Sequence, residues 1–257
     1  MYSPKPDLLL VHSFPTNSVL LHGLTEFLSD YFTVHFVDLP GFHRDIPPLK
    51  WPITVEKFAN YLDQKIADLN SDKYVVGGIS FGFLVVNKAK LGKNCKAILA
   101  MEPFINTECL SIPFWKQRKY ALIIGLMKLI HVLGAEDYIW KSKWFNEYLQ
   151  RQSDYPAERV NIIIEHIDPK TFFSVAATLL NYRKRPKFHL LPHFLIGNFA
   201  DTTINFDHVV EVFIKNLHEL HIASEPIDHY PKTLTKEYFK TRISKEHISR
   251  ILACIEG

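Results

Sequence analysis

The stretch Gly77-Gly78-Ile79-Ser80-Phe81-Gly82 decides how the rest of this 257-residue chain is interpreted. An apolar, β-prone run at 73–76 leads into it, and a run with a mixed helical pattern at 83–91 follows it. Between a strand and a helix, Gly-x-Ser-x-Gly forms a sharp turn whose central residue is strained and whose flanking glycines avoid collisions. Such a turn exposes one serine hydroxyl above the sheet. We therefore interpret Ser80 as a candidate nucleophile rather than as part of an ordinary glycine turn.

Composition limits the class of protein. Hydrophobic residues make up 47% and charged residues 22% of the chain, which is ordinary for one large domain or for a core with an insertion. The net charge of +3 is small and the basic residues are scattered, so we expect no nucleic-acid partner. The three cysteines have no metal-binding or redox spacing. We expect reduced, mostly buried thiols, no metal, no cofactor, no signal peptide and a cytoplasmic location.

Strand-like and helix-like segments alternate along the first part of the chain. The apolar, β-prone runs of this part are 7–11, 33–37, 73–76 and 96–101. The alternation resumes with a fifth run within 188–197 and a sixth at about 220–227. This order is typical of a mostly parallel sheet with helices on both faces, whose ligands bind at the carboxyl ends of the strands. We predict a doubly wound α/β fold with about six strands.

The alternation stops from about 104 to 187, where the pattern is helical and rich in large aromatic side chains. We predict that this stretch is a helical cap over the site, and that the core comprises 1–103 and 188–257. Some of the aromatic side chains are expected to line an acyl pocket, although a plain helical packing unit would have the same composition. The longest apolar run, Tyr120 to Leu133, has about 14 residues and contains Lys128. We expect it to cover the pocket, without stable insertion into a membrane.

Four motifs follow one another along the chain. They are His12-Ser13-Phe14-Pro15, Asp38-Leu39-Pro40-Gly41-Phe42, the Ser80 turn, and Asp201 followed later by His229. In this order they resemble the α/β-hydrolase fold family over nearly the whole length of the chain. Only about six residues precede the first strand, which leaves no room for the family's usual N-terminal hairpin. The resemblance therefore implies an all-parallel core of six strands with an inserted helical cap.

The resemblance also implies a chemistry, which is nucleophilic acyl transfer. Ser80 would attack the carbonyl carbon, His229 would act first as base and then as acid, and Asp201 would orient the imidazole. The backbone N–H groups of Phe14 and Phe81 would hold the oxyanion. We therefore predict a metal-independent serine hydrolase that cleaves carboxylic esters through an acyl-enzyme. Its partner would be a small-molecule ester with an apolar acyl group.

Two members of this triad have rivals in the sequence. Glu102 ends the strand after the Ser80 turn, where some members of the family carry their acid, and could replace Asp201. Asp207 also follows the fifth strand, but it precedes a helical run and is expected to cap that helix. His247 is the most plausible rival of His229, yet it lies inside the last helical pattern and is expected on the surface.

The partner of His229 and the reaction itself are also open to more than one interpretation. Asp228 directly precedes His229 and could compete with Asp201 as its partner. A thioesterase or a carbon–carbon bond hydrolase would use the same triad. A ligand-binding protein that does not turn over could share the fold. The sequence does not determine the oligomeric state.

Overall fold

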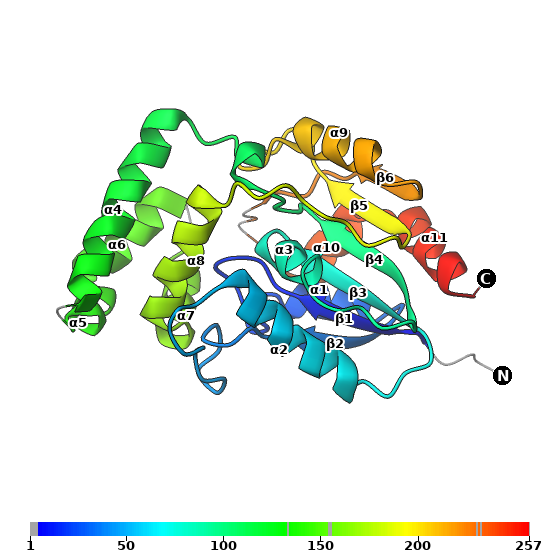
Figure 1. Ribbon diagram of the computed structural model, residues 1–257, viewed down its shortest axis with the longest axis horizontal. Coiled ribbons are helices and arrows are strands. Elements are labelled where there is room, and N and C mark those ends of the chain that lie inside the picture. The colour runs from blue at the N-terminus through cyan, green and yellow to red at the C-terminus, as the bar shows by residue number, and fades with distance from the viewer. Residues whose placement is uncertain (1–4, 133, 154–155, 230, 232, 257) are drawn as a thin grey trace.

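The computed structural model describes residues 5–132, 134–153, 156–229, 231 and 233–256. Its centre is a parallel sheet with the strand order β2-β1-β3-β4-β5-β6 (Figure 1). The strands are β1 (Asp7–Val11), β2 (Thr33–Val37), β3 (Tyr74–Ile79), β4 (Cys95–Met101), β5 (His193–Gly197) and β6 (Leu220–Ser224). Each neighbouring pair is parallel, which confirms the predicted all-parallel, six-stranded core.

Helices cover both faces of this sheet. The helices outside the stretch between β4 and β5 are α1 (His22–Leu28), α2 (Val55–Asp68), α3 (Phe81–Val86), α9 (Phe206–Asn216), α10 (Lys236–Arg242) and α11 (Lys245–Glu256). Alternate residues of β1 belong to the two apolar clusters: Leu9 and Val11 pack with α2, α3 and α9, whereas Leu8 and Leu10 pack with α1, α10 and α11. A strand that is buried on both faces in this way has a continuous apolar sequence.

The C-terminal part of the chain differs from the sequence-based expectation. The last helical pattern of the sequence forms two helices, α10 and α11. The chain leaves the helical conformation at Ile243, and the Ser244 hydroxyl accepts a bond from the Glu246 N–H (3.2 Å). The expected surface position of His247 is wrong. Its side chain is buried, and its ring lies 5.9 Å from that of Phe194. Burial lowers the pKa of His247 to about 4, so a neutral imidazole serves as core packing.

The start of α9 also differs from expectation. The prediction that Asp207 caps this helix is wrong, since Asn205 is the N-cap and its side-chain oxygen accepts from the His208 N–H at 3.0 Å. Asp207 lies in the first turn, where a carboxylate is favourable next to unpaired backbone N–H groups. Asn is as good an N-cap as Asp. The two positions are therefore hard to tell apart by residue type alone.

Between β4 and β5 the chain leaves the sheet and forms a layer of helices beside it, at the left of Figure 1. Its elements are the 3-10 turn η1 (Thr107–Cys109), α4 (Phe114–Val132), α5 (Glu136–Trp140), α6 (Lys143–Ser153), α7 (Ala157–His166) and α8 (Pro169–Asn181). The Thr107 N–H donates to the Tyr182 carbonyl (2.8 Å), and its hydroxyl donates to the Leu179 carbonyl (3.0 Å). The start and the end of the inserted segment are thereby joined. We propose that residues 104–187 act as a cap unit.

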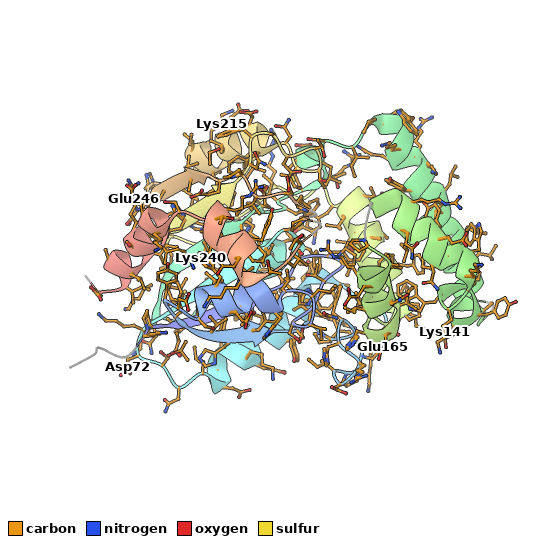
Figure 2. All side chains as sticks on the ribbon, turned by 180° about the vertical axis from the view of Figure 1, so that it is seen from behind. Asp72, Lys141, Glu165, Lys215, Lys240 and Glu246 are labelled. Carbon is orange, nitrogen blue, oxygen red and sulfur yellow. The ribbon has the colours of Figure 1, made fainter. Side chains whose placement is uncertain are left out.

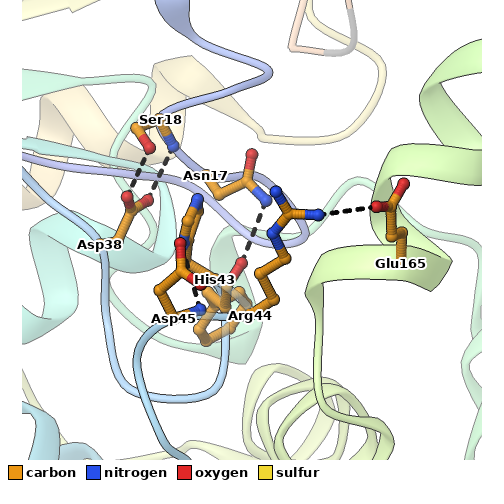
Figure 3. Close-up of polar contacts among 8 residues, drawn as sticks. Asn17, Ser18, Asp38, His43, Arg44, Asp45 and Glu165 are labelled. Atoms are coloured by element: carbon orange, nitrogen blue, oxygen red, sulfur yellow. Dashed lines mark hydrogen bonds and ion pairs between the residues drawn. The ribbon is translucent and has the colours of Figure 1, made fainter.

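A second set of contacts joins the loop after β2 to its surroundings (Figure 3). Asp38 accepts from the N–H and the hydroxyl of Ser18, at 2.7 and 2.5 Å. Arg44 pairs with Glu165 of α7 at 3.0 Å. Both partners of that pair are more than half exposed, so it contributes little to stability but marks where the loop meets the inserted helices.

Two further expectations concern cysteines and membranes. Cys95 and Cys109 are buried free thiols, and burial raises the pKa of Cys95 to about 12 and that of Cys109 to about 11, so neither forms a thiolate readily. Of the helices that the structure describes, none has the length and apolar character needed to cross a membrane. Leu133 and the side chain of Lys128, both part of the long apolar run, lie outside the described residues.

Candidate active site

The turn between β3 and α3 places Ser80 at the carboxyl edge of the sheet. Ser80 has a φ of 48°, in the left-handed region that disfavours a residue with a side chain. A Cβ atom at Gly78 would lie 2.5 Å from the Phe83 nitrogen, and one at Gly82 would lie 2.5 Å from the His12 carbonyl oxygen. Both positions therefore require glycine, as the motif predicts, because backbone approaches them too closely for any side chain.

Polar contacts connect Ser80, His229 and Asp201. The Ser80 Oγ lies 3.3 Å from the His229 Nε2, and the His229 Nδ1 lies 3.2 Å from the Asp201 Oδ2. The side chains of His229 and Asp201 are only 5% and 2% exposed. The two residues come from the loops after β6 and β5, and the parallel strands bring these loops to one edge. The structure thus brings together the three residues that the sequence nominates as nucleophile, base and acid.

The surroundings of Asp201 hold its carboxylate in place. Its Oδ1 accepts from the Thr203 N–H at 2.7 Å, and its own N–H donates to the Asn198 carbonyl at 3.0 Å. Burial acts to raise the pKa of Asp201, but the hydrogen bond and the Coulombic attraction of His229 outweigh it, so the pKa lies below its usual value. Asp201 is therefore a carboxylate at neutral pH and suits the role of orienting an imidazole.

Glu102, the alternative acid, lies beside this pair. It directly follows β4, has a φ of 42°, and is 4% exposed. One of its carboxyl oxygens lies within 4.8 Å of ligand atoms of Asp201 and His229. Burial, and then the charge of Asp201, raise the pKa of Glu102 to about 10. Two adjacent carboxyl groups thus differ in protonation, and the ionised one is the one that contacts the His229 Nδ1.

Asp228 and His12 have other partners. The Asp228 N–H donates to the Tyr238 hydroxyl at 3.1 Å, and the ring nitrogen of His229 that could face Asp228 lies against Asp201 instead. His12 is fully buried, and its Nε2 accepts from the Leu39 N–H at 3.0 Å. Burial lowers the pKa of His12, so the ring is a neutral link between two loops.

The two candidate oxyanion donors are Phe81, which directly follows Ser80, and Phe14, which lies in the loop after β1. Phe81 is the first residue of α3, and Phe14 lines the same cavity as Ser80. Neither N–H donates a hydrogen bond to any residue in the described part of the chain. Unused backbone donors beside a serine hydroxyl are what a developing oxyanion requires.

A cavity of about 980 Å³ lies between Ser80 and the inserted helices. Its lining is mainly apolar and comes largely from α4, α6, α7 and α8: Ile123, Ile124, Phe145, Leu149, Ile163, Phe172, Phe173, Ala176, Leu179 and Leu180. Of the large aromatic side chains in the segment 104–187, Tyr120, Phe145, Tyr148, Phe172 and Phe173 are among those that line the cavity. Trp140 packs in the core, whereas Phe114, Trp115, Tyr138 and Trp144 are exposed. Composition could not separate these groups, because the same side chains suit both environments.

Several cavity residues carry no sequence signal. Lys116 and Arg242 provide cationic groups to its lining, from α4 and α10. The Arg242 Nη1 donates to the Pro226 carbonyl at 2.7 Å, and its guanidinium lies 5.4 Å from the centre of the Tyr238 ring. These positions lie in helices far apart in sequence, so only the tertiary fold could reveal them.

Glu102, Asp201 and His229 are also the residues whose spacing could accommodate a metal ion. Three such donor groups are sufficient for a divalent cation when all of them are deprotonated. In this chain, however, Asp201 and Ser80 each contact one ring nitrogen of His229, and Glu102 is neutral. Both ring nitrogens of His229 thus already have contacts, which makes this group less suited to holding a metal ion, and the absence of a cofactor stays a prediction.

Known proteins resemble the chain in sequence over part of its length. No family model matches it. Over 90 residues it is 34% identical to a pimeloyl-[acyl-carrier protein] methyl ester esterase of Aeromonas hydrophila subsp. hydrophila. The matched region covers 35% of this chain and 34% of that protein. The chain therefore spans about a third of the length of this curated relative.

Solved structures resemble the chain over nearly its whole length. A hydrolase from Oleispira antarctica has a TM-score of 0.69 and 13% identity, with 99% of this chain and 92% of that chain covered. A thermophilic esterase from Thermogutta terrifontis has a TM-score of 0.64 and 16% identity, with the same coverage. The fold expected from the four motifs is confirmed. The chain has the α/β-hydrolase fold.

The neutral state of Glu102 leads to a prediction about stability. The unfolded chain ionises this group near its usual pKa of 4.5, whereas the folded chain keeps the proton up to about pH 10. The folded state thus binds more protons between these values, and this contribution to stability decreases as the pH rises. In the parent chain this one proton makes the free energy of unfolding fall by up to about 1.4 kcal/mol per pH unit. In Glu102→Gln that contribution is absent, so the free energy of unfolding should fall less steeply with pH than in the parent chain.

Urea denaturation at a series of pH values measures this slope. The exposed Glu108 offers a matched control, since Glu108→Gln should leave the slope of the parent chain unchanged. Equal slopes for Glu102→Gln and the parent chain would mean that Glu102 is ionised in the fold.

Proposed function

We propose that this chain is a serine hydrolase that cleaves carboxylic esters. The observation that carries the proposal is the succession of contacts from Ser80 through His229 to Asp201 at the strained turn, beside a large apolar cavity. Each residue is of the type that its position in acyl transfer needs. The partial match to a methyl ester esterase supports ester cleavage over the thioesterase and carbon–carbon alternatives.

The geometry supports a two-step reaction. His229 Nε2 takes the proton of Ser80 Oγ as the oxygen attacks the ester carbonyl, and the N–H groups of Phe14 and Phe81 stabilise the oxyanion. His229 then gives the proton to the alcohol, which leaves an acyl group on Ser80. A water molecule, activated by the same imidazole, releases the acid. Throughout, the Asp201 carboxylate stabilises the imidazolium through Nδ1.

The cavity supports a substrate class. Most of its lining consists of Leu, Ile and Phe side chains, with Lys116 and Arg242 as cationic exceptions. Burial of a methylene group against such side chains is favourable by about 0.8 kcal/mol. We infer that the acyl part of the substrate is an extended apolar chain. A small alcohol group is inferred from the methyl ester named for the curated relative.

The nucleophile is tested first. Ser80→Ala should reduce hydrolysis of a p-nitrophenyl ester by several orders of magnitude, because loss of a triad member leaves only binding and oxyanion stabilisation. A fluorophosphonate probe should label the parent chain and not this variant. Ser249→Ala, on the exposed side of α11, is the control and should label normally. Retention of a tenth of the parent rate by Ser80→Ala would refute the serine mechanism.

The acid is tested by two substitutions that keep shape. Asp201→Asn should lower kcat by up to about 10⁴ with little change in KM, because the amide selects the wrong imidazole tautomer. Glu102→Gln should cost little, since glutamine resembles the neutral acid that burial favours. Steady-state kinetics on one ester, with circular dichroism to verify folding, measures both. A large loss in Glu102→Gln alone would assign the acid's role to Glu102.

The acyl pocket is tested by filling it. Ala176 of α8 lines the cavity and its neighbour Ala177 does not. Ala176→Phe should therefore shift the preferred p-nitrophenyl ester to a shorter acyl chain, by several methylene groups, while Ala177→Phe keeps the parent preference. A profile of kcat/KM against chain length reports the shift. Unchanged profiles in both variants would place the acyl group elsewhere.

A further inference from the structure

Helix α4 is apolar on two opposite sides, and only one of them packs on the molecule. Its inner side contributes Tyr120, Ile123 and Ile124 to the cavity lining. Its other side carries a row of side chains that we call the α4 outer face: Trp115, Leu122, Leu126 and Leu129, which are 64%, 76%, 57% and 57% exposed. The spacing of seven, four and three residues keeps the row on one side of the helix.

Such a row is not ordinary surface composition. A helix that is apolar all round is normally buried on all sides, in a core or in lipid. Single exposed leucines are common in folded proteins, but a continuous apolar row marks a binding surface. The expectation that this run only covers the pocket therefore accounts for one side of α4 and leaves the other without a partner among the described residues.

A second helix, α6, contacts α4 and carries an exposed tryptophan. The ammonium group of Lys119 lies 5.8 Å from the centre of the Tyr148 ring in α6, which joins the two helices. The ring of Trp144 stacks on Tyr148 at 5.9 Å and is itself 67% exposed. The Tyr148 ring thus contacts both Lys119 of α4 and the exposed Trp144 of α6. Tryptophan and lysine are typical of the level at which lipid headgroups meet acyl chains.

Charge completes the description of this surface. Residues 114–144 contain six Lys or Arg and two Asp or Glu, so this stretch carries +4, whereas the whole chain carries only +3. Arg118 and Lys119 are exposed on either flank of the α4 outer face. Figure 2 shows Lys141 at the edge of the inserted helices, far from the sheet. Two exposed cationic side chains, Arg118 and Lys119, thus lie directly beside the apolar row.

We propose that the α4 outer face docks reversibly on an anionic phospholipid bilayer. Leu122, Leu126 and Leu129 would enter the boundary of the acyl chains with α4 parallel to the surface, and the tryptophan and cationic side chains would lie among the headgroups. Self-association by the same face is disfavoured, because it would bring two cationic surfaces together. The proposal depends on the exposed side of α4 and not on the chemistry of Ser80.

Vesicle flotation of the full chain tests the proposal. The probes are phosphatidylcholine vesicles alone and vesicles with about one third phosphatidylglycerol, each at low and at high salt. The chain should float with the anionic vesicles, and high salt should weaken the binding without abolishing it, because the apolar contribution is not screened. Leu122→Gln combined with Leu126→Gln should reduce the partition coefficient by about tenfold or more at both salt concentrations.

Two further variants separate the contributions. Arg118→Gln combined with Lys141→Gln should weaken binding by about tenfold at low salt and by much less at high salt. Ile214→Gln is the matched control, because Ile214 is a 60% exposed apolar residue on the distant helix α9, and its loss should change nothing. Circular dichroism verifies that each variant is folded.

Three results would overturn the proposal. The first is failure of the parent chain to float with anionic vesicles. The second is binding of the leucine variant equal to that of the parent. The third is a parent chain that runs as a dimer and becomes a monomer in the leucine variant, which would assign the face to a second copy of this chain.

Discussion

Close approach of backbone to backbone at Gly82 is the constraint on which the site depends. The first turn of α3 packs against the carbonyl groups of Val11, the last residue of β1, and of His12, which follows it, with no space for a side chain between them. This contact fixes where α3 begins relative to the sheet, and hence where Ser80 projects. The same end of β1 continues into the loop that carries Phe14. Nucleophile and proposed oxyanion donor are thus positioned by one contact, which explains how a strained residue at Ser80 is tolerated.

Two neighbouring carboxyl groups of the site, those of Asp201 and Glu102, differ in protonation state. Asp201 receives a backbone N–H and the ring of His229, so its charge is stabilised despite burial. Glu102 lies in the same interior without comparable compensation, and the adjacent charge of Asp201 opposes its ionisation. Of these two neighbouring carboxyl groups, only that of Asp201 is therefore ionised.

The sequence predicts the sheet well because its strands are buried on both faces and have continuous apolar runs, as at 7–11. It also predicts the Ser80 turn, since only glycine fits the two flanking positions. It does not predict the burial of His247, because helical periodicity alone cannot show that Phe194 lies opposite. It also cannot distinguish Trp115 from Phe145, since a large aromatic side chain is compatible with either an exposed surface or a cavity wall.

The hydrogen bonds from Thr107 to the carbonyl groups of Tyr182 and Leu179 have a consequence for evolution. They bring the two ends of the inserted segment side by side. The chain that leaves β4 and the chain that returns to β5 are thus held together at these residues. We therefore expect that helices α4 to α7, which lie between these two points, can change in length or be exchanged while the strands of the sheet keep their places. Changes in substrate range and in surface affinity can accumulate there while Ser80 and its partners remain in register.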